Sequence, residues 1–283
     1  MALLPAAIGA RAEGPAMPAG SPRRIVSLDL CVDQILVDLV APARIAALSH
    51  LAADPQVSAV AERARTLPAT RGDAEVVLGL DPDLVIAGMY GVAATASLLE
   101  RVGRPVVRIA LASDIDGVRG IVRQIAAAVA EPERGEAVIA AFDQRLARTA
   151  FDEQAARPSA LVYQVNGLAS GPGTLDDAVL RAAGFRNLAA ELHLGSGGTL
   201  PLEALVATPP DLLVLSGPVD EHRTVVADNL RHPALSAVRR ERASIVLPWR
   251  NWLCGTPYLA EAVEGLSRAR QTLLGGRNKA PKP

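Results

Sequence analysis

This chain of 283 residues has few aromatic residues and cysteines, and it has no excess of basic charge. With 29 basic and 30 acidic side chains, the formal net charge is −1, which argues against a nucleic-acid partner. No apolar run approaches the roughly 20 residues that a membrane span needs. The motifs of nucleotide-binding loops, zinc peptidases and serine hydrolases are also missing. We therefore expect a globular protein that is not an enzyme and holds no cofactor or resident metal.

The only cysteines are Cys31 and Cys254. They form no C-x-x-C motif, and no Cys/His pair has zinc-ligand spacing. Each follows a predicted strand, one in each half of the chain, so both are candidates to face a common cleft. A disulfide between them requires Cα atoms within about 7 Å. The alternative, two buried free thiols, stays open.

Residues 1–21 have the composition of a leader rather than of a fold. Ala2–Ala10 is a short apolar run, and Ala10–Ala12 has the small-x-small form of a signal-peptidase site. Because the basic segment that normally comes first is missing, we expect a secretory signal peptide shortened at its front, followed by a linker. A disordered leader rich in alanine and proline is the alternative.

Beyond residue 21, short β-branched runs alternate with helical patterns, which is typical of parallel sheets covered on both faces. The expected strands are 24–28, 44–49, 83–87, 105–109, 160–165, 211–216 and 244–247. Residues 114–156 contain helical patterns only, including a helix from Pro132 to about Ala155, about 36 Å long. We therefore predict an α/β fold with two Rossmann-like lobes: an N-terminal lobe (22–112), connecting helices (113–157), a C-terminal lobe (158–274) and a disordered tail (275–283).

An internal repeat supports two lobes built on one plan. The segment EVVLGLDPDLVI (residues 75–86) matches EALVATPPDLLV (residues 203–214), with the Glu, Pro and Asp at identical spacing. Each copy predicts a short helix, a turn and a buried strand. Glu75 and Glu203 fall in the first turn of these helices, where Asp73 and Thr199 are the expected caps.

Several further motifs occur in an order that resembles one known family. These are RIVSL (24–28), the two repeat copies, the connecting helix, SGPGTLDD (170–177), AAGFRNLA (182–189) and NLRHPAL (229–235). The chain resembles the periplasmic substrate-binding proteins of ABC importers for cobalamin, iron–siderophore complexes and heme, the helical-backbone metal receptors. The resemblance implies two lobes joined by a single long α-helix, with the ligand in the cleft between them and little lobe closure. It also implies a periplasmic location and a permease dimer as partner; we expect a monomer.

All the tyrosines and tryptophans fall at or just beyond the ends of predicted strands, where open parallel sheets bind ligands. Taken singly, each has an ordinary position at the edge of a core; together they favour a bulky, partly apolar ligand. Arg250 is the only arginine directly beside them, so a corrinoid is favoured over a ferric siderophore, which would need several arginines. The expected ligand-binding residues are Cys31, Asp33, Tyr90, Tyr163, Asn166, Trp249, Arg250, Trp252, Cys254 and Tyr258.

Two other functions remain open from the sequence. One is a receptor for a free transition-metal ion, for which His50, Cys31, Asp33 and Cys254 are the candidate ligands. The other is an enzyme on a two-lobed α/β scaffold, since a fold does not determine a function. For Glu75 and Glu203, the resemblance implies docking to arginines of the two permease subunits. The simpler interpretation is a carboxylate that stabilises a helix N-terminus.

Overall fold

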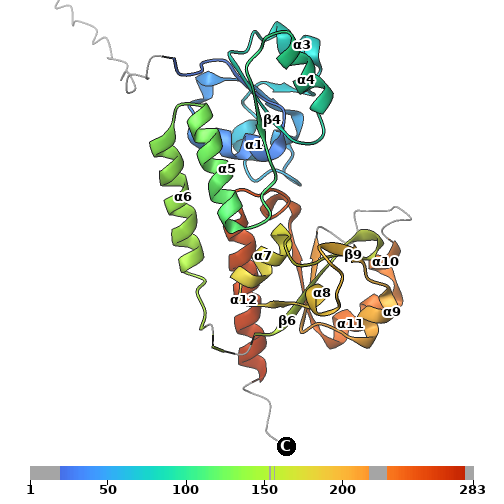
Figure 1. Ribbon diagram of the computed structural model, residues 1–283. Coiled ribbons are helices and arrows are strands. Elements are labelled where there is room, and N and C mark those ends of the chain that lie inside the picture. The colour runs from blue at the N-terminus through green and yellow to red at the C-terminus, as the bar shows by residue number, and fades with distance from the viewer. Residues whose placement is uncertain (1–19, 153, 156, 217–227, 278–283) are drawn as a thin grey trace, which may run out of the picture.

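The computed structural model describes residues 20–152, 154–155, 157–216 and 228–277. Two α/β lobes lie one above the other, and helices α5 and α6 run along one side of both (Figure 1). Most of the expected leader and the last six residues of the expected tail lie outside the described residues. In the described part of the chain, no helix combines the length and apolar character needed to cross a membrane.

The N-terminal lobe is built on a five-stranded parallel sheet in the order β3-β2-β1-β4-β5. Ile25 and Ile86 pack on the face covered by α1, whereas Val26 and Val85 pack on the opposite face. This burial on both faces explains the continuous apolar runs in the sequence. The strands are β1 (Ile25–Ser27), β2 (Ile45–Ser49), β3 (Ala69–Thr70), β4 (Leu84–Gly88) and β5 (Val106–Ile109), and the helices are α1 (Leu30–Leu39), α2 (Ala61–Ala64), α3 (Ala74–Gly79) and α4 (Ala93–Arg101).

The C-terminal lobe has a mixed sheet in the order β11-β10-β6-β7-β9, with β8 also paired to β6. The strands β11, β10, β6 and β8 pair in parallel, whereas β7 pairs antiparallel with both β6 and β9. The strands are β6 (Ser159–Tyr163), β7 (Leu168–Ser170), β8 (Arg186–Asn187), β9 (Gly197–Thr199), β10 (Leu212–Ser216) and β11 (Ala243–Leu247). The helices are α7 (Leu175–Ala182), α8 (Leu188–Glu191), α9 (Leu202–Ala207), α10 (Asp228–Arg231), α11 (Pro233–Glu241) and α12 (Leu259–Arg277).

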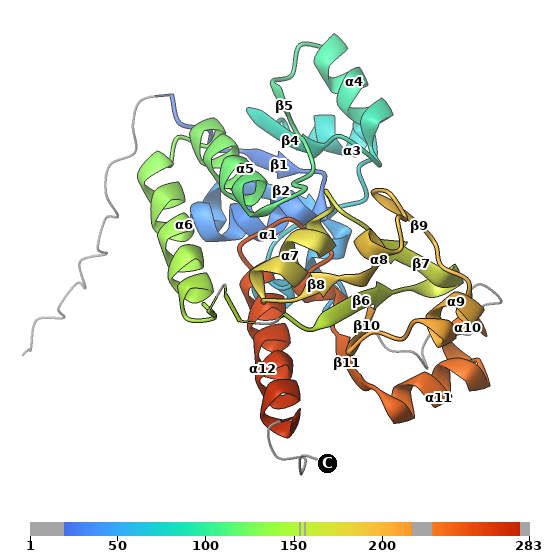
Figure 2. The ribbon, with the colours of Figure 1, turned by 60° about the horizontal axis from the view of Figure 1, so that its bottom comes forward.

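The connector consists of α5 (Ile115–Ala128) and α6 (Pro132–Ala147), which pack side by side (Figures 1 and 2). Helix α6 contacts α1 in one lobe and α12 in the other, and α5 contacts α1 and α7, so both helices of the connector bridge the lobes. It ends at Ala147 rather than near Ala155, which makes it about 24 Å long. At this end the Thr149 hydroxyl donates to the Leu146 carbonyl oxygen at 2.7 Å.

The internal repeat is a structural repeat as well. Helices α3 and α9, and strands β4 and β10, have identical bounds at an offset of 128 residues. The aspartate of each copy accepts hydrogen bonds from the backbone of the neighbouring central strand. Asp83 accepts them from the amides of Arg23 and Arg24 at 2.7 and 2.9 Å, and Asp211 accepts one from the Ser159 amide at 2.8 Å. Each carboxylate thus fixes the start of that strand.

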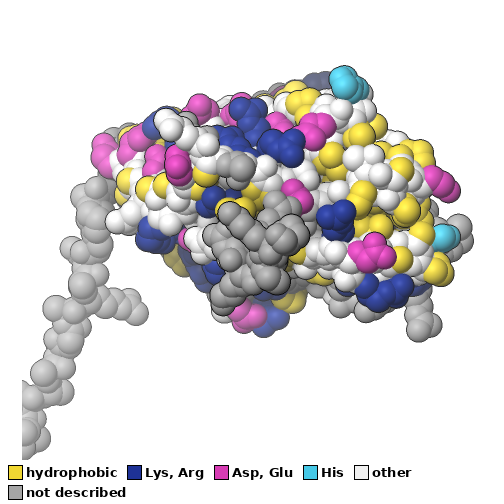
Figure 3. Space-filling model, turned by 90° about the horizontal axis from the view of Figure 1, so that it is seen from below, with side chains coloured by type: hydrophobic (Ala, Val, Ile, Leu, Met, Phe, Trp, Pro, Cys, Tyr) yellow, Lys and Arg dark blue, Asp and Glu magenta, His cyan; other side chains and the backbone are white. Residues whose placement is uncertain are grey.

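Acidic and basic side chains are interspersed on the face that is seen from below (Figure 3). Hydrophobic side chains lie between them. Several pairs bind helices together: Arg145 forms two 2.9 Å hydrogen bonds to Glu264 between α6 and α12, and Arg119 contacts Asp143 at 2.7 Å between α5 and α6. The first pair holds the connector against the C-terminal lobe, and the second holds its two helices together.

Candidate functional site

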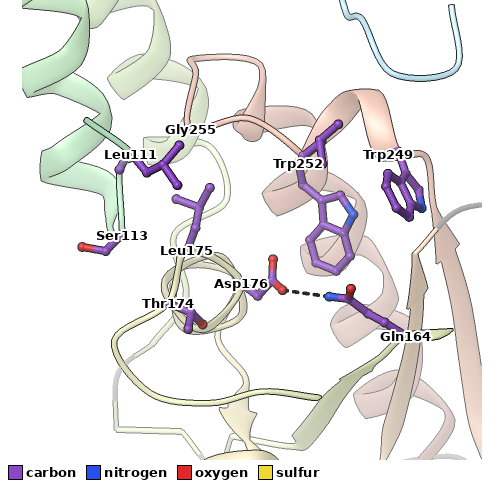
Figure 4. A pocket seen from close by; sticks show the side chains of 11 residues that line it. Leu111, Ser113, Gln164, Thr174, Leu175, Asp176, Trp249, Trp252 and Gly255 are labelled. Atoms are coloured by element: carbon purple, nitrogen blue, oxygen red, sulfur yellow. Dashed lines mark hydrogen bonds between the residues drawn. The ribbon is translucent and has the colours of Figure 1, made fainter. Parts of the chain in front are cut away.

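A cavity of about 430 Å³, open toward solvent, lies between the lobes. It is bounded by the segments that follow β5, β6 and β11. The cavity therefore lies at the carboxyl ends of the strands, where parallel sheets are expected to bind ligands. Residues from the connection between β5 and α5 form one wall, and the loop after β11 forms the opposite wall (Figure 4). The lining residues are Leu111, Ala112, Ser113, Gln164, Thr174, Leu175, Asp176, Trp249, Trp252, Leu253 and Gly255.

Most of this lining is apolar, and some of it is exposed to solvent. Leu111 is 66% exposed and Leu253 is 45% exposed, which is unusual for leucine next to a hollow. Trp249 belongs to the short 3₁₀ turn Trp249–Asn251, whereas the ring of Trp252 is nearly buried and also packs in the core of the C-terminal lobe. Flat indole faces and leucine side chains suit a bulky apolar ligand.

Asp176 is the single charged side chain among the described residues that line the cavity. Its Oδ2 accepts a hydrogen bond from the Ser170 hydroxyl at 2.5 Å and a long one from the Gln164 amide nitrogen at 3.4 Å (Figure 4). Burial raises the pKa of Asp176 above its ordinary value, and the hydrogen bond from Ser170 opposes this shift. Asp176 therefore offers a hydrogen-bond acceptor to the cavity, and its uncharged partners hold the side chain in place.

Beside the cavity, α1 is joined to the segment between β11 and α12 by a seam of three residue pairs. Cys31 forms a disulfide with Cys254, with Cα atoms 5.2 Å apart. The Thr256 hydroxyl donates to the Gln34 side-chain oxygen at 3.1 Å, and the Tyr258 hydroxyl contacts both carboxylate oxygens of Asp38 at 3.1 and 3.0 Å. Positions 31, 34 and 38 share one face of α1, and residues 254, 256 and 258 each contact this face.

The loop after β11 passes very close to Ala112 at Gly255. A Cβ atom at this position would lie 2.6 Å from the Cβ of Ala112, a distance that real side chains do not adopt. Glycine is therefore required where the loop passes the start of the connector. Gly255 and Ala112 both line the cavity, so this contact also forms its wall.

Of the sequence-predicted ligand residues, Trp249 and Trp252 line the cavity, and Cys31 and Cys254 lie in the adjacent seam. Tyr90 is 71% exposed beyond the end of β4, where Met89 donates a backbone hydrogen bond to Ile109 on β5. These positions put Tyr90 at the cleft edge of the N-terminal sheet, and its contact with a ligand stays a prediction.

The other five predicted residues do not line this cavity. Tyr163 is buried in the core of the C-terminal lobe, because its side chain alternates inward from β6. Asp33 is fully buried and accepts hydrogen bonds from the amide and hydroxyl of Ser49. Tyr258 belongs to the seam, Arg250 contacts the Pro55 carbonyl oxygen at 3.5 Å across the lobes, and Asn166 is exposed in the turn after β6.

Sequence reasoning missed Leu111, Gln164 and Asp176. Leu111 comes two residues after the expected strand 105–109, and Gln164 lies near the end of the expected strand 160–165. The rule that identified the aromatics would therefore also have found them. Asp176 lies in the SGPGTLDD motif, where Thr174 caps α7 by accepting from the Asp177 amide. The motif does not indicate in which direction the side chain of Asp176 points.

The expected ligands for a free metal ion are not assembled. The sulfur atoms of Cys31 and Cys254 are bonded to each other, Asp33 faces Ser49 in the interior, and His50 is exposed. Among the described residues, no group of three or more potential ligands is gathered at any other place either.

Glu75 and Glu203 are both exposed, on α3 and α9. These two helices lie on the side of the molecule away from the connector (Figures 1 and 2). Neither helix has the cap that the sequence suggested, because Asp73 makes no side-chain capping bond and Thr199 belongs to β9, with Pro201 at the cap position. Within the described structure, neither glutamate has an ion-pair or hydrogen-bond partner of its own.

Two α/β lobes, a connector of two helices that contact both lobes, and a cavity between the lobes define the class of two-lobed binding proteins. A sequence model of the periplasmic binding protein family matches residues 25–242, so the chain belongs to that family. Proteins of this family bind solutes for ABC transporters and deliver them to the permeases. This confirms the resemblance that the motifs indicated, at the level of the family and the fold.

Similar proteins carry different chelates. A cobalamin-binding protein of Halobacterium salinarum is 33% identical over 144 residues, half of this chain and 39% of that protein. The periplasmic heme-binding protein of Roseiflexus sp. RS-1 in apo form is 26% identical, with a TM-score of 0.72 over 90% of this chain and 99% of that one. The vitamin B12 binding protein of Vibrio cholerae shares the fold, at 19% identity and a TM-score of 0.67 over 90% of this chain and 98% of that one.

Proposed function

We propose that this protein captures a bulky metal chelate in the periplasm and delivers it to an inner-membrane ABC importer, and that the chelate is a corrinoid. The observation that supports this choice is the lining of the interlobe cavity, which offers two indoles, three leucines and one carboxylate. No described lining residue is basic. Heme and anionic ferric siderophores carry negatively charged groups, for which arginines are the usual partners.

The relatives are consistent with this choice without deciding it. The Halobacterium salinarum relative is named a cobalamin-binding protein, but this chain spans about two fifths of its length. The other neighbours named above include a heme-binding protein. The composition of this chain's own cavity therefore carries the proposal.

Delivery, in this account, uses Glu75 and Glu203. The repeat places one exposed carboxylate at the same position of each lobe, and a pair of this kind fits a permease made of two related subunits. Exposed charges at an interface set orientation and association rate more than affinity. We propose that the protein acts as a monomer, with one lobe facing each subunit.

The test is the visible spectrum and native mass of the protein purified from a periplasmic extract of cells supplied with cobalamin. A corrinoid absorption band with the matching mass increment is expected. A heme or ferric-siderophore band would assign the cavity to that chelate instead. The mass of a bare metal ion would support the free-ion receptor, and turnover of a substrate would support the enzyme.

A further inference from the structure

Asp176 occupies an unusual position for a carboxylate. It lies in the first turn of α7, on the floor of the cavity, with Leu175 and Trp252 on either side (Figure 4). The hydrogen bonds from Ser170 and Gln164 both go to Oδ2. The second oxygen, Oδ1, points into the space between Leu175 and Trp252, and it accepts no hydrogen bond from the described residues (Figure 4).

The partners of Asp176 fix its orientation without neutralising it. Ser170 and Gln164 are uncharged, and no described residue of the cavity supplies a cation. The lining is otherwise largely apolar, so charges interact more strongly here than in bulk water. A ligand that fills the cavity must therefore place one of its own chemical groups next to Oδ1.

Two kinds of ligand group have opposite consequences at this position. An N–H or O–H donor satisfies the oxygen with a charge-assisted hydrogen bond. A carboxylate would bring a second negative charge into a partly desolvated site, where it gains no partner and repels the first. The free energy of binding thus depends on the periphery of the chelate, not only on its size and flat shape.

We propose that Asp176 is the specificity-determining residue of the cavity, which admits chelates with neutral amide or hydroxyl side chains and excludes those with carboxylates. This inference rests on the proposed function, because it assumes that the chelate binds between the lobes. It deepens that function by naming the chemical class that the cavity selects: amide-bearing macrocycles rather than acid-bearing ones.

The test compares cyanocobalamin with its separate monocarboxylic acids, each of which has one side-chain amide hydrolysed. Calorimetric titration at pH 8 keeps these acids ionised. For the unmodified protein, at least one isomer should bind at least tenfold more weakly than cyanocobalamin. In the Asp176→Asn variant, the same isomer should bind within about threefold of cyanocobalamin, because the charge is gone and the shape is kept.

Asp116→Asn is the matched control. Asp116 is a highly exposed acid at the start of α5, close in sequence to Ser113, and it does not line the cavity. This variant changes the net charge by the same amount and should keep the full discrimination.

Equal binding of cyanocobalamin and every isomer by the unmodified protein would overturn the inference without any variant. A penalty that survives in Asp176→Asn would overturn it as well. In both cases cyanocobalamin still binds, and the proposed function stands. If the unmodified protein does not bind cyanocobalamin at all, the proposed function fails and the inference fails with it.

Discussion

Asp33 lies in the first turn of α1 with its side chain fully buried. Burial raises its pKa from 3.8 to about 7, although hydrogen bonds from Ser27 and Ser49 oppose the shift. The folded protein therefore holds this proton more tightly than the unfolded chain does. Between pH 3.8 and about 7, each rise in pH lowers the free energy of unfolding through this group.

Asp33→Asn should remove that dependence. The amide keeps the shape and an acceptor for the Ser49 backbone amide, but it does not ionise. Urea unfolding at pH 5 and pH 8 is the measurement: the unmodified protein should lose more stability than the variant over this interval. If the two proteins lose stability in parallel, Asp33 does not titrate in this range.

Trp249→Ala should weaken ligand binding by about 1–2 kcal/mol, roughly five- to thirtyfold, if the indole is an anchor of the site. Trp252→Ala is a poorer probe, because the Trp252 ring also packs in the core and its loss would destabilise the lobe. Tyr163→Phe is the control, since Tyr163 is buried away from the cavity. Unchanged affinity of Trp249→Ala for cyanocobalamin would remove this loop from the site.

For the aromatic residues, the sequence was sufficient to predict that they lie at the edge of the sheet. It was not sufficient to predict the direction in which each side chain points. Trp249 and Tyr163 both occur at the end of a strand, yet one lines the cavity and the other lies in the core. In a strand buried on both faces, apolar residues occupy every position, so no alternation indicates which side chain turns outward. The direction becomes fixed only when neighbouring elements pack.

At the scale of elements, the seam between α1 and the segment before α12 should restrict movement of the lobes. Its disulfide closes a loop with a sequence separation of 223 residues, and chain-entropy accounts assign about 5 kcal/mol to a loop of that size. Thiol counting on denatured, unreduced protein should find no free thiol. Two free thiols would contradict the bridge.

Cys31→Ser combined with Cys254→Ser should lower the melting temperature and leave the lobes joined, because the Gln34–Thr256 and Asp38–Tyr258 pairs remain. Reduction of the unmodified protein should produce the same shift, and reductant should have no effect on the double variant. A melting temperature equal to that of the oxidised protein would show that the bridge adds no stability.

Most elements were predictable because their patterns are local. The seven expected strands and both connecting helices are present, and the repeat predicted the helix and strand of each copy, which are α3 with β4 and α9 with β10. Strands β3 and β8 escaped prediction because each has only two residues. Strands β7 and β9 also escaped it, since they are three residues long and β9 contains Gly197 and Gly198. Their antiparallel pairing depends on tertiary contacts rather than on intrinsic strand propensity.

At the scale of the whole molecule, Glu75→Arg combined with Glu203→Arg should abolish uptake in cells or proteoliposomes that contain the cognate permease. Ligand affinity in solution should stay nearly unchanged, because both side chains are exposed on helices away from the cavity lining. Reversed charges would meet the permease arginines as like charges.

The control for this experiment is Glu62→Arg with Glu241→Arg, which reverses one exposed acid on each lobe outside the repeat. This variant should transport normally. Normal transport by the variant of Glu75 and Glu203 would mean that these carboxylates only stabilise their helix N-termini.

The central claim, that a corrinoid binds between the lobes, is tested most directly by titrating the protein with cyanocobalamin and following tryptophan fluorescence. Trp249 and Trp252 are the only tryptophans, and both line the cavity. With free tryptophan as the control for light absorption by the ligand, the account predicts saturable quenching that ends at one corrinoid per chain. Fluorescence that falls no further than that of the control, up to millimolar cyanocobalamin, would contradict it.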